Sequence, residues 1–400
     1  MFPRVWAKIQ AEYFDPSFGG VNVAELERSA AAALAGTKSL AETYAVIAQA
    51  VTNLGDSHTV FVPPPRPVKV EYGVSFDVIG NQVHLGGVKP GSDAEKQGLH
   101  GGERVLRVNG LPATRDTLHL IRYSIRALNP QPGLRLQLAD ADGATREVTF
   151  AAEVKTQPRR LDYSSGDFRL LELDQQDREA KLASTFVDLA PGVLWWKLPS
   201  FMVPVEVERG LRKAADYAHV IVDLRGNPGG LESEMLDAIG ACLGEKRPIG
   251  RVRHRTHEEP LVASSRRQVR GQLYVLLDGN SASAAEVFAR ALQLAGRAVV
   301  LGDRSAGKVN RGRFHPLTLG NGSNLVVFGV QVTEDEIRMS DGQPLEKVGV
   351  TPDVWLVPSA KDILAGNDPV LATAAKMAGA TLSKEQAGEI SRRHRPPVFD

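Results

Sequence analysis

The sequence predicts a multidomain α/β protein, because its local pattern changes twice along the chain. At 400 residues the chain is too long for one ordinary domain and long enough for two or three, each with its own core. A helical pattern covers residues 1–65, short strands and turns cover 66–155, and buried strands alternate with helices over 156–360. Residues 361–400 predict a C-terminal helical tail.

The composition limits which kinds of binding partner and location we expect for the protein. Lys and Arg number 48 against 47 Asp and Glu, so the overall charge favours neither nucleic acid nor an anionic membrane surface. No apolar run reaches the ~18 residues that span a bilayer, and the first residues lack the pattern of a secretory signal. The single cysteine, Cys242, lies among small apolar residues and predicts a buried core thiol. We expect neither a metal nor a cofactor.

The first block predicts two helices. Residues 21–36 and 39–55 carry apolar side chains at steps of three and four, and each segment closes on a glycine that can serve as a C-cap. Pro63, Pro64 and Pro65 then interrupt the pattern and favour an extended connector, which marks the first boundary.

The second block predicts short strands joined by tight turns. Asn109-Gly110 and Asp142-Gly143 are residue pairs typical of such turns. Helices are expected at 92–99 and 117–128. The expected strand segments are 70–80, 81–88, 103–110, 134–143 and 145–154.

The third block predicts a largely parallel sheet with helices on its faces. Apolar strand runs at 219–230, 272–280 and 297–303 alternate with helical segments, and a variable strand-rich stretch precedes them. In such sheets the ligand site lies at the carboxyl ends of the strands. Glycine-containing turns follow two of these strands, at residues 226–230 and 279–280, so both turns are expected near the site.

Ser283 lies where the strand at 272–280 leads into a helix. Asn280 or Ser281 could act only as an N-cap for that helix. Alternatively, Ser283 in the first turn could be a nucleophile, because the helix dipole and the next N–H favour a developing oxyanion. The spacing alone leaves both interpretations open.

The middle block resembles a PDZ domain, a family that binds the carboxyl ends of peptides. The resemblance rests on the helix-then-strand pattern of residues 92–110 and on the stretch Tyr72–Phe76. It implies that backbone N–H groups of Gly73, Val74, Ser75 and Phe76 hold a substrate carboxylate while a sheet edge pairs with the incoming strand. The alternative is that this module only packs on its neighbour.

Ordered motifs over nearly the whole chain resemble the carboxyl-terminal processing (tail-specific) serine peptidases, with tricorn-like features. The motifs are VIVDLRGNPGG, LLDGNSASAAEVFARAL, VVLGDRSAGK and LEKVGVTPDVWL. The resemblance implies a crotonase/ClpP-like α/β protease core that cleaves protein or peptide substrates. It also implies that Ser283 is the nucleophile and that N–H groups of Gly229, Gly230 and Ala284 form the oxyanion hole.

Two candidates exist for the general base. The dyad enzymes of this family use a lysine 25 residues after the serine, which matches Lys308, but many place a glutamine where this chain has Gly312. Tricorn-like members use a histidine preceded by a serine, and a glutamate late in the core, which match His58, Ser57 and Glu346. Histidine titrates near neutral pH and needs no large pKa shift, so we favour His58.

Other readings stay open at this stage. A ligand-binding relative with a degenerate site would show a similar sequence, and an acyl-CoA enzyme of the crotonase type would share the core but would not need a serine nucleophile. The location is also open: the lack of a signal pattern fits the cytoplasm, whereas the resemblance implies a location outside it, in the cell envelope. The resemblance leaves the oligomeric state open.

Overall fold

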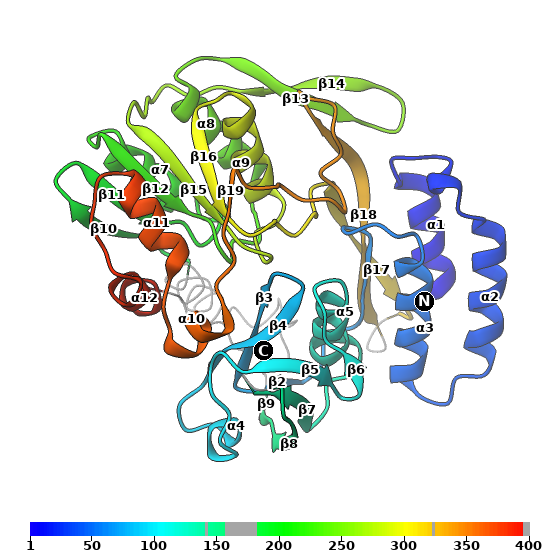
Figure 1. Cartoon of the computed structure of the whole chain (residues 1–400). Coiled ribbons are helices and arrows are strands. Elements are labelled where there is room, and N and C mark those ends of the chain that lie inside the picture. Colours follow the sequence, from blue (N-terminus) through cyan, green and yellow to red (C-terminus); the bar gives the residue numbers. More distant parts are fainter. Residues whose placement is uncertain (141–142, 157–181, 322–324, 395–400) are drawn as a thin grey trace, which may run out of the picture.

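The computed structural model describes residues 1–140, 143–156, 182–321 and 325–394 (Figure 1). The expected strand-rich stretch before the core falls largely on residues outside these ranges. Figure 1 shows the N-terminal helices beside a long strand pair, the strands of the middle block below, and the α/β core above.

The N-terminal segment contains α1 (Phe2–Glu12), η1 (Phe18–Gly20), α2 (Val23–Ala35) and α3 (Leu40–Thr52). Both predicted helices, α2 and α3, are confirmed. Each begins at a polar N-cap: the side chains of Asn22 and Ser39 accept backbone N–H groups of the first turn. Buried aromatic and aliphatic side chains of α1 and α3, such as Trp6 and Ile47, join one core with strand residues from far along the chain.

The middle block forms a sheet in the order β3-β4-β5-β7-β8, with β6 paired to β5 and β2-β9 as a separate ribbon. Asn109 and Gly110 both have positive φ (48° and 84°), which confirms the predicted tight turn. The elements are β2 (Val68–Glu71), β3 (Val74–Ile79), β4 (Gln82–Val88), α4 (Asp93–Lys96), β5 (Arg104–Val108), β6 (Leu111–Pro112), α5 (Leu118–Tyr123), η2 (Ser124–Leu128), β7 (Gly133–Ala139), β8 (Thr145–Ala151) and β9 (Glu153–Thr156).

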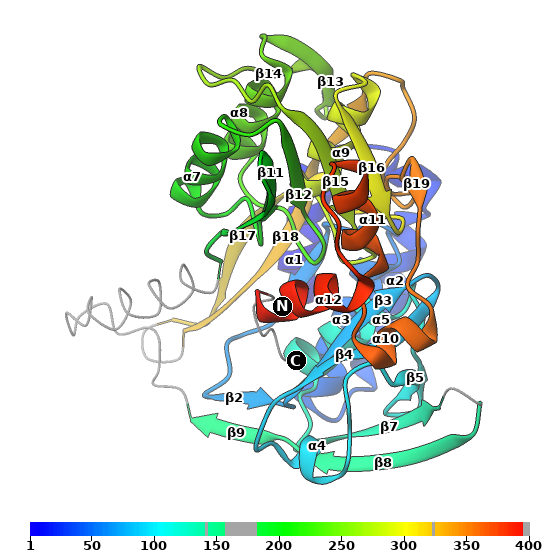
Figure 2. The same ribbon diagram turned by 60° about the vertical axis from the view of Figure 1, so that its left-hand side comes forward.

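The core contains a sheet in the order β10-β11-β12-β15-β16-β19, parallel except for β10. Side chains of α7, α8 and α9 pack on one face, and side chains of the last two helices, residues 369–377 and 384–393, pack on the other. Figure 2 shows this sheet between its helices. The elements are β10 (Thr185–Ala190), β11 (Val193–Lys197), α7 (Pro204–Ala214), β12 (His219–Asp223), α8 (Glu232–Leu243), β15 (Gln272–Leu277), α9 (Ala284–Leu294), β16 (Ala298–Gly302) and β19 (Val354–Trp355). The predicted parallel sheet is confirmed.

A second, antiparallel sheet was not predicted. It comprises β1 (Val60–Val62), β13 (Arg247–Arg253), β14 (Glu258–Ala263), β17 (Arg311–Leu319) and the long β18 (Val326–Met339). Strand β1 follows the N-terminal helices directly and pairs with β18, from Val60 opposite Gln331 to Val62 opposite Gly329. This pairing carries the end of the N-terminal segment to the core.

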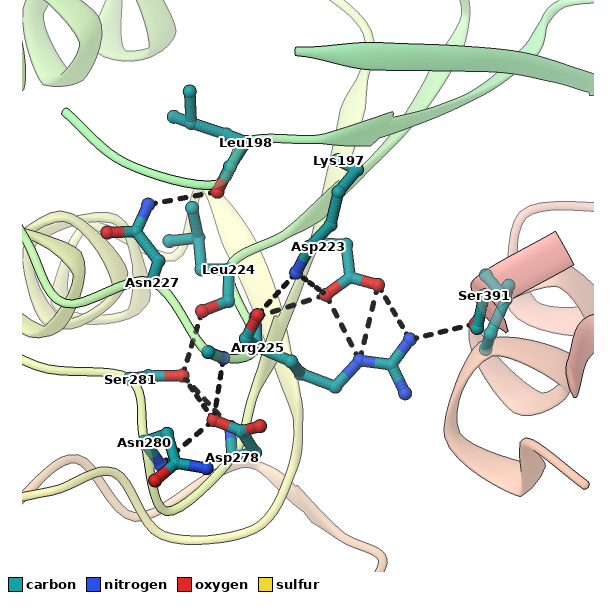
Figure 3. Close-up of polar contacts among 12 residues, drawn as sticks. Lys197, Leu198, Asp223, Leu224, Arg225, Asn227, Asp278, Asn280, Ser281 and Ser391 are labelled. Carbon is teal, nitrogen blue, oxygen red and sulfur yellow. Dashed lines mark hydrogen bonds and ion pairs between the residues drawn. The ribbon is translucent and has the colours of Figure 1, made fainter. Parts of the chain in front are cut away.

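The C-terminal segment contains α10 (Ala360–Ala365), α11 (Pro369–Met377) and α12 (Lys384–Arg393). A buried ion cluster at the carboxyl edge of the parallel sheet anchors it, because Arg225 contacts Asp223 of β12, Asp368 before α11 and Ser391 of α12 (Figure 3). Lys197 of β11 also reaches Asp223, at 3.3 Å.

Cys242 is buried in the core, as predicted, and burial raises the pKa of its thiol to about 12. Within the described ranges, every helix is too short or too polar to cross a membrane.

Candidate active site

Ser283 occupies the turn between β15 and α9 in a strained backbone conformation, with φ 55° and ψ −120°. Few non-glycine residues adopt positive φ, and such strain concentrates at functional sites. Ser283 is itself the N-cap residue of α9, so neither Asn280 nor Ser281 has the capping role considered from the sequence. The Ser283 hydroxyl group therefore lies at the positive end of the helix dipole.

Ser281 has a structural role instead. Its buried hydroxyl group donates to the carbonyl of Leu224 at 2.9 Å and contacts Asp278 Oδ1 at 3.1 Å (Figure 3). Asp278 Oδ1 also accepts the N–H of Gly226 at 2.9 Å. These contacts hold the end of β12 against the end of β15, so the two glycine-containing turns meet as predicted.

The glycine-rich turn lies directly against the serine. A Cβ atom on Gly229 would come within 2.7 Å of Ser283 Cβ, and one on Gly230 would come within 2.3 Å of the Phe201 backbone. Both glycines also have positive φ, 100° and 151°. Only glycine fits at these two positions without displacing the backbone or Ser283.

The assignment of oxyanion donors needs a correction at Gly229. Its N–H donates to Asn227 Oδ1 at 2.8 Å, so it is already engaged in this structure. Asn227 is fully buried and also donates to the carbonyl of Leu198 at 3.0 Å, which braces the turn (Figure 3). In the described part of the chain, the N–H groups of Gly230 and Ala284 donate to no acceptor. These two groups are the donors free to bind an oxyanion.

Glu286 was missed by the sequence analysis. This fully buried carboxylate accepts the N–H of Ser283 at 3.0 Å, the Ser305 hydroxyl at 2.5 Å, and the N–H groups of Gly307 and Lys308 at 2.7 and 2.8 Å. Burial raises the pKa of Glu286, although the four donors favour its charged form. The sequence did contain a signal for Glu286: it is a charged residue in the first turn of a helix predicted to be buried, three positions after the serine.

His58 lies in the connector between α3 and β1. Its Nδ1 is 2.8 Å from the hydroxyl oxygen of Ser57, and Asp56 Oδ1 accepts its backbone N–H at 2.6 Å. A neutral imidazole whose Nδ1–H donates to Ser57 leaves the Nε2 lone pair free to accept a proton. Burial lowers the pKa of His58, while the charges of Glu346 and Asp56 oppose that shift.

Glu346 reaches Ser57 through the main chain. Its Oε1 accepts the Ser57 backbone N–H at 3.2 Å, and its Oε2 accepts the N–H of Val309 at 2.9 Å. The next residue, Lys347, has φ 64°, so Glu346 lies on a sharp turn. The carboxylate thus joins the His58 connector to the segment that contains Lys308.

Gly312 provides the space beside His58. A Cβ atom at position 312 would lie 3.1 Å from His58 Cβ and 2.7 Å from Gln331 Nε2. The first distance is tighter than an ordinary van der Waals contact. Many Ser/Lys dyad enzymes of this family have a glutamine at this position. The glycine found here instead leaves room for His58, the histidine that the tricorn-like pattern requires.

Lys308 adjoins Ser283 through its backbone, since its carbonyl accepts the Ser283 N–H at 2.7 Å. Burial lowers the pKa of its ammonium group, and the charge of Arg122 lowers it further. Neither Lys308 Nζ nor His58 Nε2 hydrogen-bonds to the Ser283 hydroxyl within the described ranges. Such catalytic contacts often shorten only when substrate binds.

The predicted carboxylate-binding residues lie at the start of β3. Gly73 has φ 71°, and its carbonyl accepts the N–H of Lys89 at 2.7 Å. Val74, Ser75 and Phe76 follow on β3, which pairs only with β4 among the described strands and so leaves one edge without a strand partner. The guanidinium group of Arg122, from α5, donates to the carbonyl of Phe76 and, at 3.3 Å, to Asn280 Oδ1 of the core.

The chain is similar in sequence to known peptidases. Residues 193–356 match the family described as peptidase family S41. The carboxyl-terminal-processing protease of Synechocystis sp. is 24% identical over 332 residues, covering 78% of this chain and 70% of that protein. The chloroplastic carboxyl-terminal-processing peptidase 1 of Arabidopsis thaliana is 23% identical, and the chain spans 65% of its length.

Solved structures share the fold. A photosystem II D1 C-terminal processing protease has a TM-score of 0.56 at 20% identity, covering 96% of this chain and 98% of that one. The tricorn protease has a TM-score of 0.51 at 17% identity, covering 94% of this chain and 36% of that one. The resemblance inferred from the motifs is thus confirmed: residues 193–356 match peptidase family S41, and this match and the relatives indicate a serine-type peptidase.

Proposed function

We propose that Ser283 is the nucleophile of this peptidase and that His58, oriented by Ser57 and Glu346, is its general base. The observation that carries the proposal is the strained Ser283 at the N-terminus of α9, packed against Gly229 and beside two unengaged N–H groups. A serine that only caps a helix needs neither feature.

The reaction follows from these positions. The hydroxyl oxygen of Ser283 attacks the scissile carbonyl carbon while its proton passes to His58 Nε2. The carbonyl oxygen, now negative, accepts the N–H groups of Gly230 and Ala284. His58 then gives its proton to the departing amine nitrogen as the C–N bond breaks, which leaves an acyl-enzyme. Water, deprotonated by His58, hydrolyses that ester and restores Ser283.

Two observations favour His58 over Lys308 as the base. The Ser57 hydroxyl contacts His58 at Nδ1, which leaves Nε2 available to face the substrate, and Gly312 leaves room for the ring. A lysine base must be neutral, and its pKa starts about four units above that of histidine. The Ser283/Lys308 dyad remains the alternative mechanism, because burial does lower the pKa of Lys308.

The middle block is proposed to act as a PDZ-like module that captures the carboxyl ends of protein substrates. The unpaired edge of β3 and the turn at Gly73 support this role, because an added strand needs a free edge and a carboxylate needs backbone donors. Arg122 now contacts the carbonyl of Phe76 on β3, so an entering peptide must displace or share that contact.

Two further parts of the proposal come from the resemblance. The parallel core and its oxyanion turns are those expected of a crotonase/ClpP-like protease core. A site of action outside the cytoplasm fits relatives that include a chloroplastic peptidase by name. Fractionation of the producing cells tests the location.

The first prediction tests the nucleophile. Ser283→Ala should leave the fold intact and lower kcat/KM for a peptide substrate by about 10⁴-fold or more, because the covalent step is lost. A fluorophosphonate probe should label the wild-type protein at Ser283 and leave the variant unlabelled. Ser281→Ala, which removes only structural hydrogen bonds, should retain labelling.

Two results would point elsewhere. A wild-type protein that resists the probe and cleaves no peptide would favour a non-catalytic ligand-binding member of the fold. Thermal stabilisation by coenzyme A esters would favour the acyl-CoA alternative.

A further inference from the structure

The tip of the β13–β14 hairpin gathers side chains that the peptidase mechanism does not use. His254 and His257 are the ends of a four-residue turn closed by the His254 N–H and the His257 carbonyl, at 2.8 Å. Their rings stack with centroids 4.3 Å apart and planes 17° apart. Glu259, the second residue of β14, faces the same place, and one ligand atom from each of the three residues lies within 4.8 Å of the others.

The orientation of the His254 ring is fixed by a carboxylate at its Nδ1 atom. Asp335 of β18 places Oδ1 2.5 Å from His254 Nδ1, and its Oδ2 contacts Arg311 at 3.2 Å. A histidine whose Nδ1–H donates to a carboxylate presents the lone pair of Nε2 on its far side. This carboxylate–histidine arrangement is the one that orients histidine ligands in metal sites.

That lone pair has no partner. His254 Nε2 is buried from solvent and makes no hydrogen bond within the described ranges. The Oε1 atom of Glu259 lies 3.2 Å away but is not aligned for one. With its Nδ1–H donated to Asp335, His254 turns the Nε2 lone pair toward a carboxylate oxygen that also carries lone pairs, and a cation between the two atoms would satisfy both.

We propose that this hairpin tip binds one zinc ion through His254 Nε2, a ring nitrogen of His257 and the Glu259 carboxylate, with water as the fourth ligand. Two imidazoles with one carboxylate suit Zn²⁺, whereas Mg²⁺ and Ca²⁺ prefer oxygen ligands. His257 and Glu259 are exposed, so they can move the short distance needed to close on the ion. We expected no metal from the sequence, because only the folded turn and Asp335 of β18 complete the arrangement.

The position of the hairpin gives the ion a structural consequence. The Arg255 guanidinium group donates to the carbonyl of Tyr13 at 2.5 Å, and Arg253 lies 3.9 Å from Asp15. The tip is thus docked on the segment that follows α1. Zinc bound to the tip should hold this junction and raise the melting temperature. The inference is independent of the proposed catalytic roles.

The test uses the full chain carrying His58→Ala, so that the proposed catalytic histidine cannot bind the ion. After treatment with a chelator, calorimetric titration with Zn²⁺ should show one equivalent bound, and Co²⁺ should give the visible absorption of a four-coordinate site. His257→Ala and Glu259→Gln should each weaken Zn²⁺ binding by at least about tenfold. Glu258→Gln is the matched control and should change nothing, since Glu258 contacts Arg251 instead.

His257 and Glu259 are exposed, so their variants should keep the metal-free melting temperature of the parent, which checks folding. Failure of the parent to bind Zn²⁺ would overturn the proposal, as would equal binding by the parent and the His257→Ala variant.

Discussion

At the scale of single residues, the identity of the general base decides the pH dependence. Only neutral imidazole accepts the Ser283 proton, so the rate must rise as pH climbs through the pKa of His58. Burial lowers that pKa from its ordinary value of 6.5, so we expect the acid limb of kcat/KM to lie below pH 6.5. A Lys308 base would instead place the limb at the pKa of its ammonium group, which burial lowers from an ordinary value of 10.5.

Substitutions separate the two bases independently of pH. His58→Ala should lower kcat about as much as Ser283→Ala, whereas Lys308→Ala should retain a substantial part of the activity. Glu346→Gln should cost about 10²-fold, since it displaces the connector without removing the proton acceptor. An inactive Lys308→Ala with an active His58→Ala would assign the chain to the dyad mechanism.

Gly312 offers a more specific test. A methyl group there would lie 3.1 Å from His58 Cβ and 2.7 Å from Gln331 Nε2, so Gly312→Ala should lower kcat by roughly tenfold through displacement of the imidazole. The melting temperature should change little. Arg313→Ala, at an exposed neighbour on β17, is the control. An unchanged kcat in Gly312→Ala would contradict the proposed role of His58.

At this scale the meeting of Ser283 with the glycine-rich turn was predictable, because both lie in short motifs at the carboxyl ends of buried strands. The engaged N–H of Gly229 was not, since it depends on the side-chain orientation of Asn227. Nor could spacing reveal that Glu346 binds the Ser57 main chain, because 289 residues separate the two.

At the scale of elements, Glu286 joins the start of α9 to the segment at 305–308. Glu286→Gln replaces one acceptor oxygen with an NH₂ group that must face backbone N–H donors. We expect it to lower the free energy of unfolding by about 1–3 kcal/mol, the range for an unsatisfied buried polar group, and to impair catalysis. Urea denaturation measures the first effect. Wild-type stability in the Glu286→Gln variant would mean that the carboxyl group is protonated in the native protein.

The raised pKa of Glu286 determines how its contribution to protein stability changes with pH. A carboxyl group with a raised pKa in the folded state contributes most below its unfolded pKa, and the contribution is lost as pH rises through the folded value. As the pH increases through the folded-state pKa of Glu286, the wild-type protein should therefore lose more stability than the Glu286→Gln variant.

The antiparallel sheet shows why some elements escaped prediction. Strand β18 contains three consecutive acidic residues, Glu334, Asp335 and Glu336, which look like a loop in the sequence. In the structure each has a basic partner on a neighbouring strand or turn, such as Arg313 for Glu334 and Arg253 for Glu336. Cross-strand pairs of this kind stabilise a strand, but only the folded chain reveals them.

At the scale of the whole molecule, the middle block is fixed to the core by a buried ion pair. Arg115 contacts Asp303 at 2.5 Å and also donates to the carbonyls of Gly80 and Arg304. Removing one partner of such a pair leaves an uncompensated charge, so the orientation of the module depends on it.

Capture of carboxyl ends can be tested on this assembled protein. A peptide with a free carboxyl end should bind the Ser283→Ala variant about tenfold or more tightly than the same peptide amidated, because the amide loses charge-assisted hydrogen bonds to backbone donors. Fluorescence anisotropy measures both dissociation constants without cleavage. Equal constants would mean that the module is structural or recognises internal segments.

The pairing of β1 with β18 has a consequence for how the protein is made. The ribosome releases His58 early, Ser283 much later, and then strand β18 and Glu346. A nascent chain therefore contains the proposed base and nucleophile before it contains β18, the strand that pairs with β1 next to His58. The proposed site can therefore be complete only once the last third of the chain has been synthesised.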